Sequence, residues 1–299
     1  MVSTRSVRQR AEGLAMSGLL SGLAAVGKVL PEANLEAQGI ELLRDVPYVA
    51  GGGAARTLDV YRPQGRGPFP TVLYIHGGGF RILSKDTHWI MGAMLARAGY
   101  LVFNINYRLA PVHRFPAALE DVCDAYAFIA ARGASFGADL SRLAIAGESA
   151  GANLATALTV ALVQEREEAY ARKAFATGLM PRAVVPYCGV HQVTDPGRFK
   201  QRKPAISQLV QSRIDIIAHG YAPEDHDVTT VRDLLDPVVV LEQRPTLARA
   251  LPPFLIPVGT KDPLIDDSRR LQAALAALGG DARVRYYPGE IHAFHAFVW

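Results

Sequence analysis

The pentapeptide GESAG at residues 147–151 places Ser149 in a context that can produce a nucleophile. An apolar run at 143–146 precedes it, and a helical pattern begins near Asn153. In a G-x-S-x-G turn between a strand and a helix, the serine projects from a sharp turn, and the glycines let neighbouring backbone approach closely. The helix that follows directs free N–H groups and the positive end of its dipole at this point. Because so short a motif is common by chance, its meaning depends on the rest of the chain.

A serine hydroxyl is a poor nucleophile unless a base lies within hydrogen-bond reach and an acid orients that base. Asp262 and His292 follow Ser149 in the chain, and each lies on the loop after a predicted strand. The order serine, aspartate, histidine is the order of the triad in α/β-hydrolases. The sequence therefore predicts Ser149 as nucleophile, His292 as general base and Asp262 as the acid that orients the base.

Other acids and histidines compete for these two roles. Asp266 and Asp267 lie close to Asp262, but they fall at the start of the next predicted helix, where acidic side chains complement the helix dipole. His295 competes with His292, but only His292 lies in the turn straight after the strand, so His295 is predicted to be a partly buried structural residue. The remaining histidines have no fitting position: His88, His113, His191, His219 and His226.

The negative charge of a tetrahedral intermediate also needs hydrogen-bond donors. Gly77, Gly78 and Gly79 follow a buried apolar run and can turn their N–H groups inward because no side chains obstruct them, although three glycines can also form a merely flexible loop. Ala150, directly after the nucleophile, supplies a further N–H. The side chain of Glu148 is expected to point away from the hydroxyl and to form structural hydrogen bonds.

Apolar runs alternate with helical patterns along the chain, which predicts a mostly parallel, doubly wound sheet flanked by helices. Strands are expected at 45–48, 56–62, 71–75, 101–105, 142–146, 183–187, 254–258 and 283–287. The first two are expected to pair antiparallel around a glycine turn. Helices are expected at 88–98, 117–131, 153–176 and 266–278. In such sheets, active groups gather at the carboxyl ends of strands, and His76, Ser149, Asp262 and His292 each follow a predicted strand.

The composition limits the other classes of function. The 299 residues suit one large α/β domain or a core with a small lid. The net charge of +4 is too small to indicate nucleic-acid binding, and the basic residues Arg198, Lys200, Arg202 and Lys203 are predicted to form a solvated surface. Cys123 and Cys188 lie in apolar patterns and are predicted to be small core residues. No metal-ligand motif is present, so neither a metal nor a cofactor is expected.

The N-terminal stretch permits two interpretations. Three arginines within residues 5–10 precede an apolar stretch at 14–30, as in a signal peptide. Glu12 and Lys28 interrupt that stretch, no small-x-small cleavage site follows, and the leucines fit one face of a helix. An amphipathic helix of a mature cytoplasmic protein is favoured, with secretion as the alternative. No run is long and apolar enough for stable membrane insertion.

Several segments, in this order, resemble the hormone-sensitive-lipase family of bacterial esterases over roughly residues 45–299. These segments are HGGGF at 76–80, YRLAPVHRFPAALED at 107–121, GESAG at 147–151, GTKDPL at 259–264 and YPGEIHAF at 287–294. The resemblance implies an α/β-hydrolase core with a small helical cap. It also implies hydrolysis of carboxylic esters with short to medium acyl chains, without a cofactor. Relatives often dimerise through an edge strand, so a homodimer is a further expectation.

The resemblance also implies roles for individual residues and a division of the chain. The triad would be Ser149, Asp262 and His292, and the oxyanion donors would be the amides of Gly78, Gly79 and Ala150, with His76 bracing the loop. Residues 1–44 and the insertion at 191–226 would form the cap, and residues 45–190 and 227–299 would form the core.

Three residues depart from the family pattern. Glu148 stands where the family usually has aspartate or threonine, Ala152 where it has a second glycine, and Val112 where it usually has a glutamate that forms an ion pair. The GESAG sequence is similar to that of the much longer type-B carboxylesterases and cholinesterases. The segment LDVY at 58–61 is similar to small formamidases and feruloyl esterases. Amide or lactone hydrolysis, including aryl formamidase activity, is therefore an alternative. A non-catalytic ligand receptor is a lesser alternative, because such receptors have lost the triad histidine and His292 is present.

Overall fold

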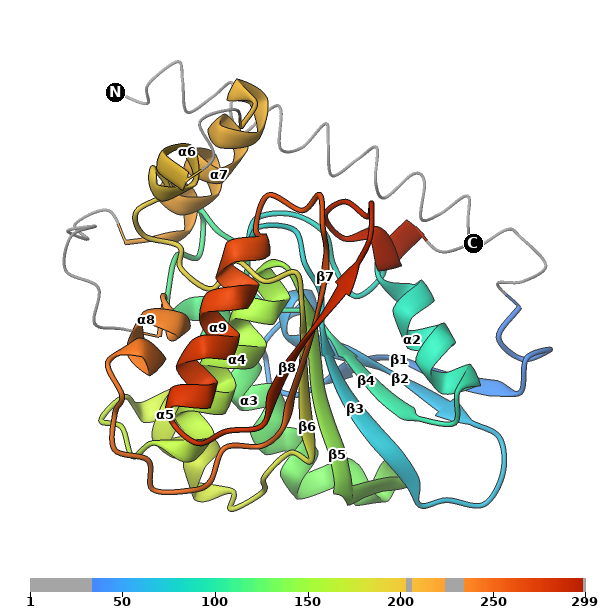
Figure 1. Ribbon diagram of the computed structural model, residues 1–299. Helices are drawn as coiled ribbons and strands as arrows, with labels where there is room; N and C mark the ends of the chain where they lie inside the picture. Colours follow the sequence, from blue (N-terminus) through green and yellow to red (C-terminus); the bar gives the residue numbers. More distant parts are fainter. Residues whose placement is uncertain (1–33, 203–205, 224–233, 298–299) are drawn as a thin grey trace.

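The computed structural model describes residues 34–202, 206–223 and 234–297, and its centre is an eight-stranded sheet (Figure 1). The strand order is β1-β2-β4-β3-β5-β6-β7-β8. The strands are β1 Ile40–Pro47, β2 Thr57–Pro63, β3 Phe69–Ile75, β4 Leu101–Ile105, β5 Ala138–Glu148, β6 Ala183–Tyr187, β7 Phe254–Gly259 and β8 Ala282–Tyr287. β1 pairs antiparallel with β2 and β2 antiparallel with β4, whereas all later pairs are parallel. The predicted fold class is thus confirmed.

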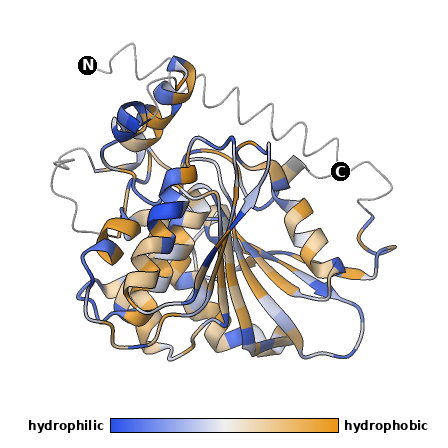
Figure 2. Ribbon diagram, in the orientation of Figure 1, coloured by the Kyte–Doolittle hydropathy of each residue, from blue (hydrophilic) through white to orange (hydrophobic). Residues whose placement is uncertain are grey.

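Helices cover both faces of the sheet, and Figure 2 shows that the central strands and the covering helices are rich in hydrophobic residues. The helices are α2 Trp89–Arg97, α3 Ala117–Arg132, α4 Ala150–Val163, α5 Ala169–Ala176, α6 Arg198–Arg202, α7 Gln208–Tyr221, α8 Pro237–Glu242 and α9 Ile265–Ala277. Alternate residues of one strand serve opposite faces: Leu73 packs in the core with α3 and α4, whereas Val72 and Tyr74 pack with α2. This alternation is the period-two geometry of a strand that is buried on both sides.

The structure corrects several expected boundaries. β1 begins at Ile40 rather than 45, and β5 begins at Ala138 rather than 142. The single helix expected over 153–176 is two helices, because Gln164 adopts an extended backbone (φ −119°, ψ 132°) after α4. α4 is buried along its whole length, and the polar segment at 164–168 interrupts the apolar pattern there. α8 was not predicted.

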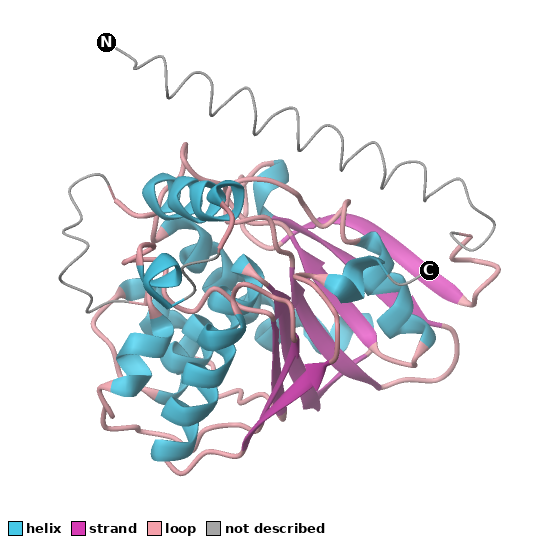
Figure 3. Ribbon diagram, turned by 45° about the horizontal axis from the view of Figure 1, so that its top comes forward, coloured by secondary structure: helices cyan, strands magenta, loops and turns pink. Residues whose placement is uncertain are grey.

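The expected insertion at 191–226 contains α6 and α7, which lie above the ends of the parallel strands in Figures 1 and 3. α7 is fixed to the loop after β3. The ring of Tyr221 stacks on Phe80 with centroids 3.7 Å apart, and Arg81 donates a hydrogen bond to the carbonyl oxygen of Ile216 at 3.0 Å. The expected N-terminal helix lies outside the described residues. Among the described residues, no helix is long and apolar enough to cross a membrane.

Candidate active site

The turn between β5 and α4 has the strained geometry expected of a nucleophile elbow. Ser149 has φ 53° and ψ −108°, a conformation that costs energy for a residue with a side chain. The backbone of the turn packs against β3, because a Cβ built on Gly151 would lie 2.1 Å from the carbonyl oxygen of Ile75. Glycine is therefore required at this position, and the hydroxyl of Ser149 is carried at the carboxyl edge of the sheet.

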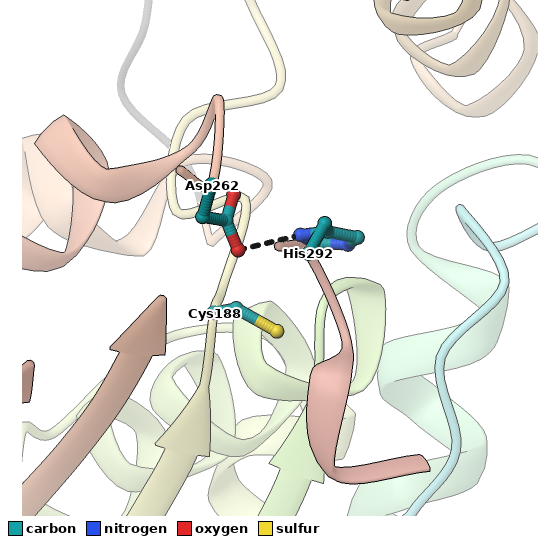
Figure 4. Close-up of side chains that lie close together, drawn as sticks. All are labelled: Cys188, Asp262 and His292. Atoms are coloured by element: carbon teal, nitrogen blue, oxygen red, sulfur yellow. Dashed lines mark hydrogen bonds and ion pairs between the residues drawn. The ribbon is translucent and has the colours of Figure 1, made fainter. Parts of the chain in front are cut away.

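The structure brings together the three side chains that the sequence nominates as a triad. The ring nitrogen Nε2 of His292 lies 3.0 Å from Oγ of Ser149, and Nδ1 lies 2.9 Å from Oδ2 of Asp262. Figure 4 shows the carboxylate of Asp262 facing the ring of His292. Asp262 is fully buried, and its Oδ1 accepts a hydrogen bond from the amide of Leu264 at 2.7 Å. Because one carboxylate oxygen is held by the backbone, the other is directed at His292.

The surroundings of His292 favour its protonated form. Burial acts to lower the pKa of the imidazole, but contacts with Cys188 and Asp262 outweigh burial and hold the pKa well above its ordinary value of 6.5. When the ring is neutral and Nδ1 donates to the carboxylate, Nε2 presents a lone pair to the hydroxyl of Ser149. The arrangement can therefore accept a proton from Ser149 and stabilise the resulting imidazolium.

The glycine loop after β3 lies beside the elbow, because Ile75 and Gly147 are paired in neighbouring strands. Gly78 has φ 105°, and a Cβ built there would lie 2.1 Å from the carbonyl oxygen of Ile82, so no other residue fits the loop. Ala150 is the first residue of α4, where an amide has no partner within the helix. The predicted oxyanion donors are thus on two adjacent segments.

His76 lies between β3 and the glycine loop and holds the start of this loop in place. Its Nδ1 donates to the carbonyl oxygen of Gly77 at 2.7 Å, and its ring stacks on Tyr107 with centroids 4.2 Å apart. The hydroxyl of Tyr107 donates to the carbonyl oxygen of His76 at 3.0 Å. Burial lowers the pKa of His76 to about 3, so the imidazole is neutral near pH 7. These contacts are those expected of a side chain that braces the glycine loop.

Glu148 turns away from Ser149 and connects three parts of the site. Its Oε2 lies 3.0 Å from Nε2 of His295, and its Oε1 lies 3.7 Å from Nε2 of His88. Oε1 also packs against Gly77, where an added Cβ would approach it to 2.7 Å. Burial acts to raise the pKa of Glu148, but His295 and His88 outweigh burial and lower it, so the carboxylate is ionised near pH 7. Through His295, Glu148 anchors the segment that carries His292.

Replacing Glu148 with glutamine is expected to lower the free energy of unfolding at pH 7 by about 1–3 kcal/mol, because it deprives the buried side chains of His295 and His88 of their carboxylate partner. The folded-state pKa of Glu148 lies below the ordinary value of 4.5, so its stabilisation is present above that value and is lost as the pH falls toward the folded-state pKa. Urea denaturation of wild type and E148Q from neutral to acidic pH measures the difference, which should shrink only at acidic pH.

The matched control is Glu242→Gln, which removes an ion pair of Arg270 whose carboxylate is 37% exposed. Exposed pairs contribute little, so E242Q should unfold nearly as wild type does. Equal losses in E148Q and E242Q would contradict the anchoring role of Glu148.

Two sequence interpretations are incomplete at the edge of the site. Arg198 was expected on a solvated surface, but its side chain is buried and its Nη2 donates to Oδ2 of Asp267 at 2.7 Å. Asp267 does lie in the first turn of α9, as expected, but it is fully buried and also accepts from the amide of His191 at 2.9 Å. This pair joins the start of the 191–226 insertion to α9. Val112, which stands where the family usually has an ion-pairing glutamate, is 77% exposed.

Comparisons with known proteins agree with this fold. A family model for the alpha/beta hydrolase fold matches residues 72–296, which is more than half of the chain. EstE1, a thermostable carboxylesterase cloned from a metagenomic library, is 25% identical, with a TM-score of 0.72 over 96% of this chain and 91% of EstE1. EstE5, in a structure soaked with p-nitrophenyl butyrate, is 26% identical, with a TM-score of 0.65 over 96% of this chain and 91% of EstE5.

An esterase from Pyrobaculum calidifontis shares the fold, with 24% identity and a TM-score of 0.71 over 95% of this chain and 86% of that esterase. The matched family model, the sheet order and these structures agree with the resemblance carried by the HGGGF and GESAG segments. The chain belongs to the hormone-sensitive-lipase family of α/β-hydrolases.

Proposed function

We propose that this protein is a carboxylesterase that hydrolyses esters of short to medium acyl chain through an acyl-enzyme on Ser149. The observation that supports this most strongly is the continuous chain of contacts from Oγ of Ser149 to Nε2 of His292 at 3.0 Å and from Nδ1 to Asp262 at 2.9 Å. The solved relatives named as esterases and carboxylesterases support the same class of reaction.

In the proposed mechanism, Oγ of Ser149 attacks the ester carbonyl while Nε2 of His292 takes its proton. Asp262 orients the ring and stabilises the imidazolium. The amides of Gly78, Gly79 and Ala150 bind the oxyanion, and His76 braces the glycine loop, with Gly77 at its start. The alcohol leaves with the proton from Nε2. A water molecule then loses a proton to Nε2 and attacks the acyl carbonyl, which releases the carboxylic acid and regenerates Ser149.

The pH dependence of kcat/KM should report the ionisation of His292 in the free enzyme. The imidazole must be neutral to accept a proton, so kcat/KM is expected to rise with pH and to level off above the pKa. Because the contacts with Cys188 and Asp262 raise that pKa above 6.5, the midpoint should lie on the alkaline side of 6.5. A profile measured at constant ionic strength, with a midpoint clearly below 6.5, would contradict this environment of His292.

A substrate panel tests the proposed reaction against amide and lactone hydrolysis. p-Nitrophenyl acetate, butyrate, hexanoate, octanoate and palmitate should show the highest kcat/KM among the shorter acyl chains. The butyryl p-nitroanilide, an aryl formamide and a γ-lactone should be poorer substrates than the butyrate ester. A higher kcat/KM for the formamide than for every ester would instead assign the protein to the amidases. Tight binding without turnover of any substrate would indicate a ligand receptor.

A further inference from the structure

Cys188 follows β6 directly and lies beside Asp262 and His292, the two triad residues that are hydrogen-bonded to each other. Its Sγ, a carboxylate oxygen of Asp262 and a ring nitrogen of His292 all lie within 4.8 Å of one another. Figure 4 shows the sulfur of Cys188 below the contact between Asp262 and His292. The three residues follow β6, β7 and β8, which are neighbours in the sheet, so the grouping is produced by the fold.

These three groups match the ligands that Zn²⁺ prefers, namely a thiolate, an imidazole nitrogen and a carboxylate oxygen. A tetrahedral zinc ion holds its ligand atoms roughly 3.5 Å apart, a separation close to that of these three atoms, which lie within 4.8 Å of one another. Three protein ligands with a fourth position open to water is also a common zinc arrangement. The charged groups that act on Cys188 are His292, Glu148 and Asp262, so two carboxylates favour a cation there.

We propose that Cys188, Asp262 and His292 form an inhibitory binding site for a borderline-soft divalent cation, with Zn²⁺ as the probe. The ligands lie at 188, 262 and 292 and are far apart in the chain. They form no metal-binding motif, so a search of the sequence for such motifs does not detect this site.

Occupation of the site would remove the proposed general base. A cation on Nδ1 uses the lone pair of that nitrogen, so the imidazole proton must move, through solvent, to Nε2. The thiol of Cys188 loses one proton to solvent, and the cation replaces the proton between Nδ1 and Asp262. With Nε2 protonated, His292 cannot accept the proton of Ser149. When His292 is neutral, binding thus releases one proton. The inhibition rests on the proposed function, but the binding does not.

Binding can be tested without any activity measurement. Titration of the wild-type protein with Cd²⁺ should produce the ultraviolet absorption of a thiolate–cadmium bond and saturate at one ion per chain. Cys188→Ser should lose this absorption and bind Zn²⁺ at least tenfold more weakly in a calorimetric titration. Cys123→Ser is the matched control, because Cys123 is equally buried but lies in α3 among apolar residues, and it should behave as wild type.

Inhibition is tested with the same proteins. Zn²⁺ should lower the kcat of wild type and C123S, EDTA should restore it, and C188S should resist inhibition at least tenfold. The apparent affinity should rise about tenfold per pH unit where His292 is neutral and the thiol of Cys188 is protonated, because one proton is released in that range. If C188S does not fold, Asp262→Asn should weaken Zn²⁺ binding in its place.

Equal Cd²⁺ absorption or equal zinc affinity in wild type and C188S would overturn the site. If wild type shows the absorption but hydrolyses no ester, the proposed esterase function fails and the cation site stands. If wild type hydrolyses esters but shows no absorption change with Cd²⁺, the site fails and the esterase function stands.

Discussion

Replacing Ser149 with alanine is expected to reduce kcat for p-nitrophenyl butyrate by at least about 10⁴-fold. Alanine keeps the fold of the elbow but removes the atom that attacks the carbonyl, and no acyl-enzyme can form. The remaining hydrolysis would come from binding of the ester beside the oxyanion donors. Purified wild type and S149A are compared at saturating substrate, with circular dichroism spectra to establish that both are folded.

The control for this variant is Ser141→Ala. Ser141 lies in β5 like the residues that lead to the elbow, but its side chain is exposed and bonds to Asp139. S141A should retain the wild-type kcat. Retention of wild-type activity by S149A would mean that another group attacks the ester, and the proposed mechanism would be wrong.

Replacing Asp262 with asparagine is expected to reduce kcat by about 10⁴-fold. The amide retains the shape of the side chain, but it removes the negative charge that stabilises the imidazolium. It can also donate to Nδ1, which would favour the tautomer with a proton on Nε2. Because Asp262 is one of the contacts that raise the pKa of His292, the midpoint of the pH profile for the residual activity should move to lower pH in D262N.

Asp266→Asn is the matched control for Asp262→Asn. Asp266 lies four residues further on, in the first turn of α9, and its carboxylate pairs with Arg269 at 2.9 Å. D266N should keep the wild-type kcat and the wild-type pH profile. Equal activity in D262N and D266N would show that Asp262 does not serve the reaction.

The residues of the candidate site could be predicted because their signals are local. Ser149, Asp262 and His292 each lie in the segment that follows a parallel strand, and the carboxyl ends of parallel strands meet at one edge of a sheet. The glycines at 77–79 and in the elbow mark close approaches of backbone, which the structure shows at Gly78 and Gly151. Strand and glycine patterns are encoded over a few residues, so they are readable without knowledge of the fold.

Other features depend on segments that meet only after folding. Arg198 looked like a surface residue because its neighbours are basic, but its partner Asp267 lies far along the chain. Likewise, the pairing of Glu148 with His88 and His295, and the position of Cys188 beneath His292, follow from the order of the strands. A sequence pattern can show that such a residue is apolar or charged, but not which distant side chain it contacts.

The most direct test of the mechanism is to map the residue that a mechanism-based phosphonate modifies. The wild-type protein is treated with a p-nitrophenyl alkylphosphonate, the release of nitrophenol is measured, and the digested protein is examined by tandem mass spectrometry. The expected result is one nitrophenol released per chain, complete loss of esterase activity, and a single phosphonyl adduct on Ser149. An adduct on any other residue, or full inactivation with Ser149 unmodified, would contradict Ser149 as the nucleophile.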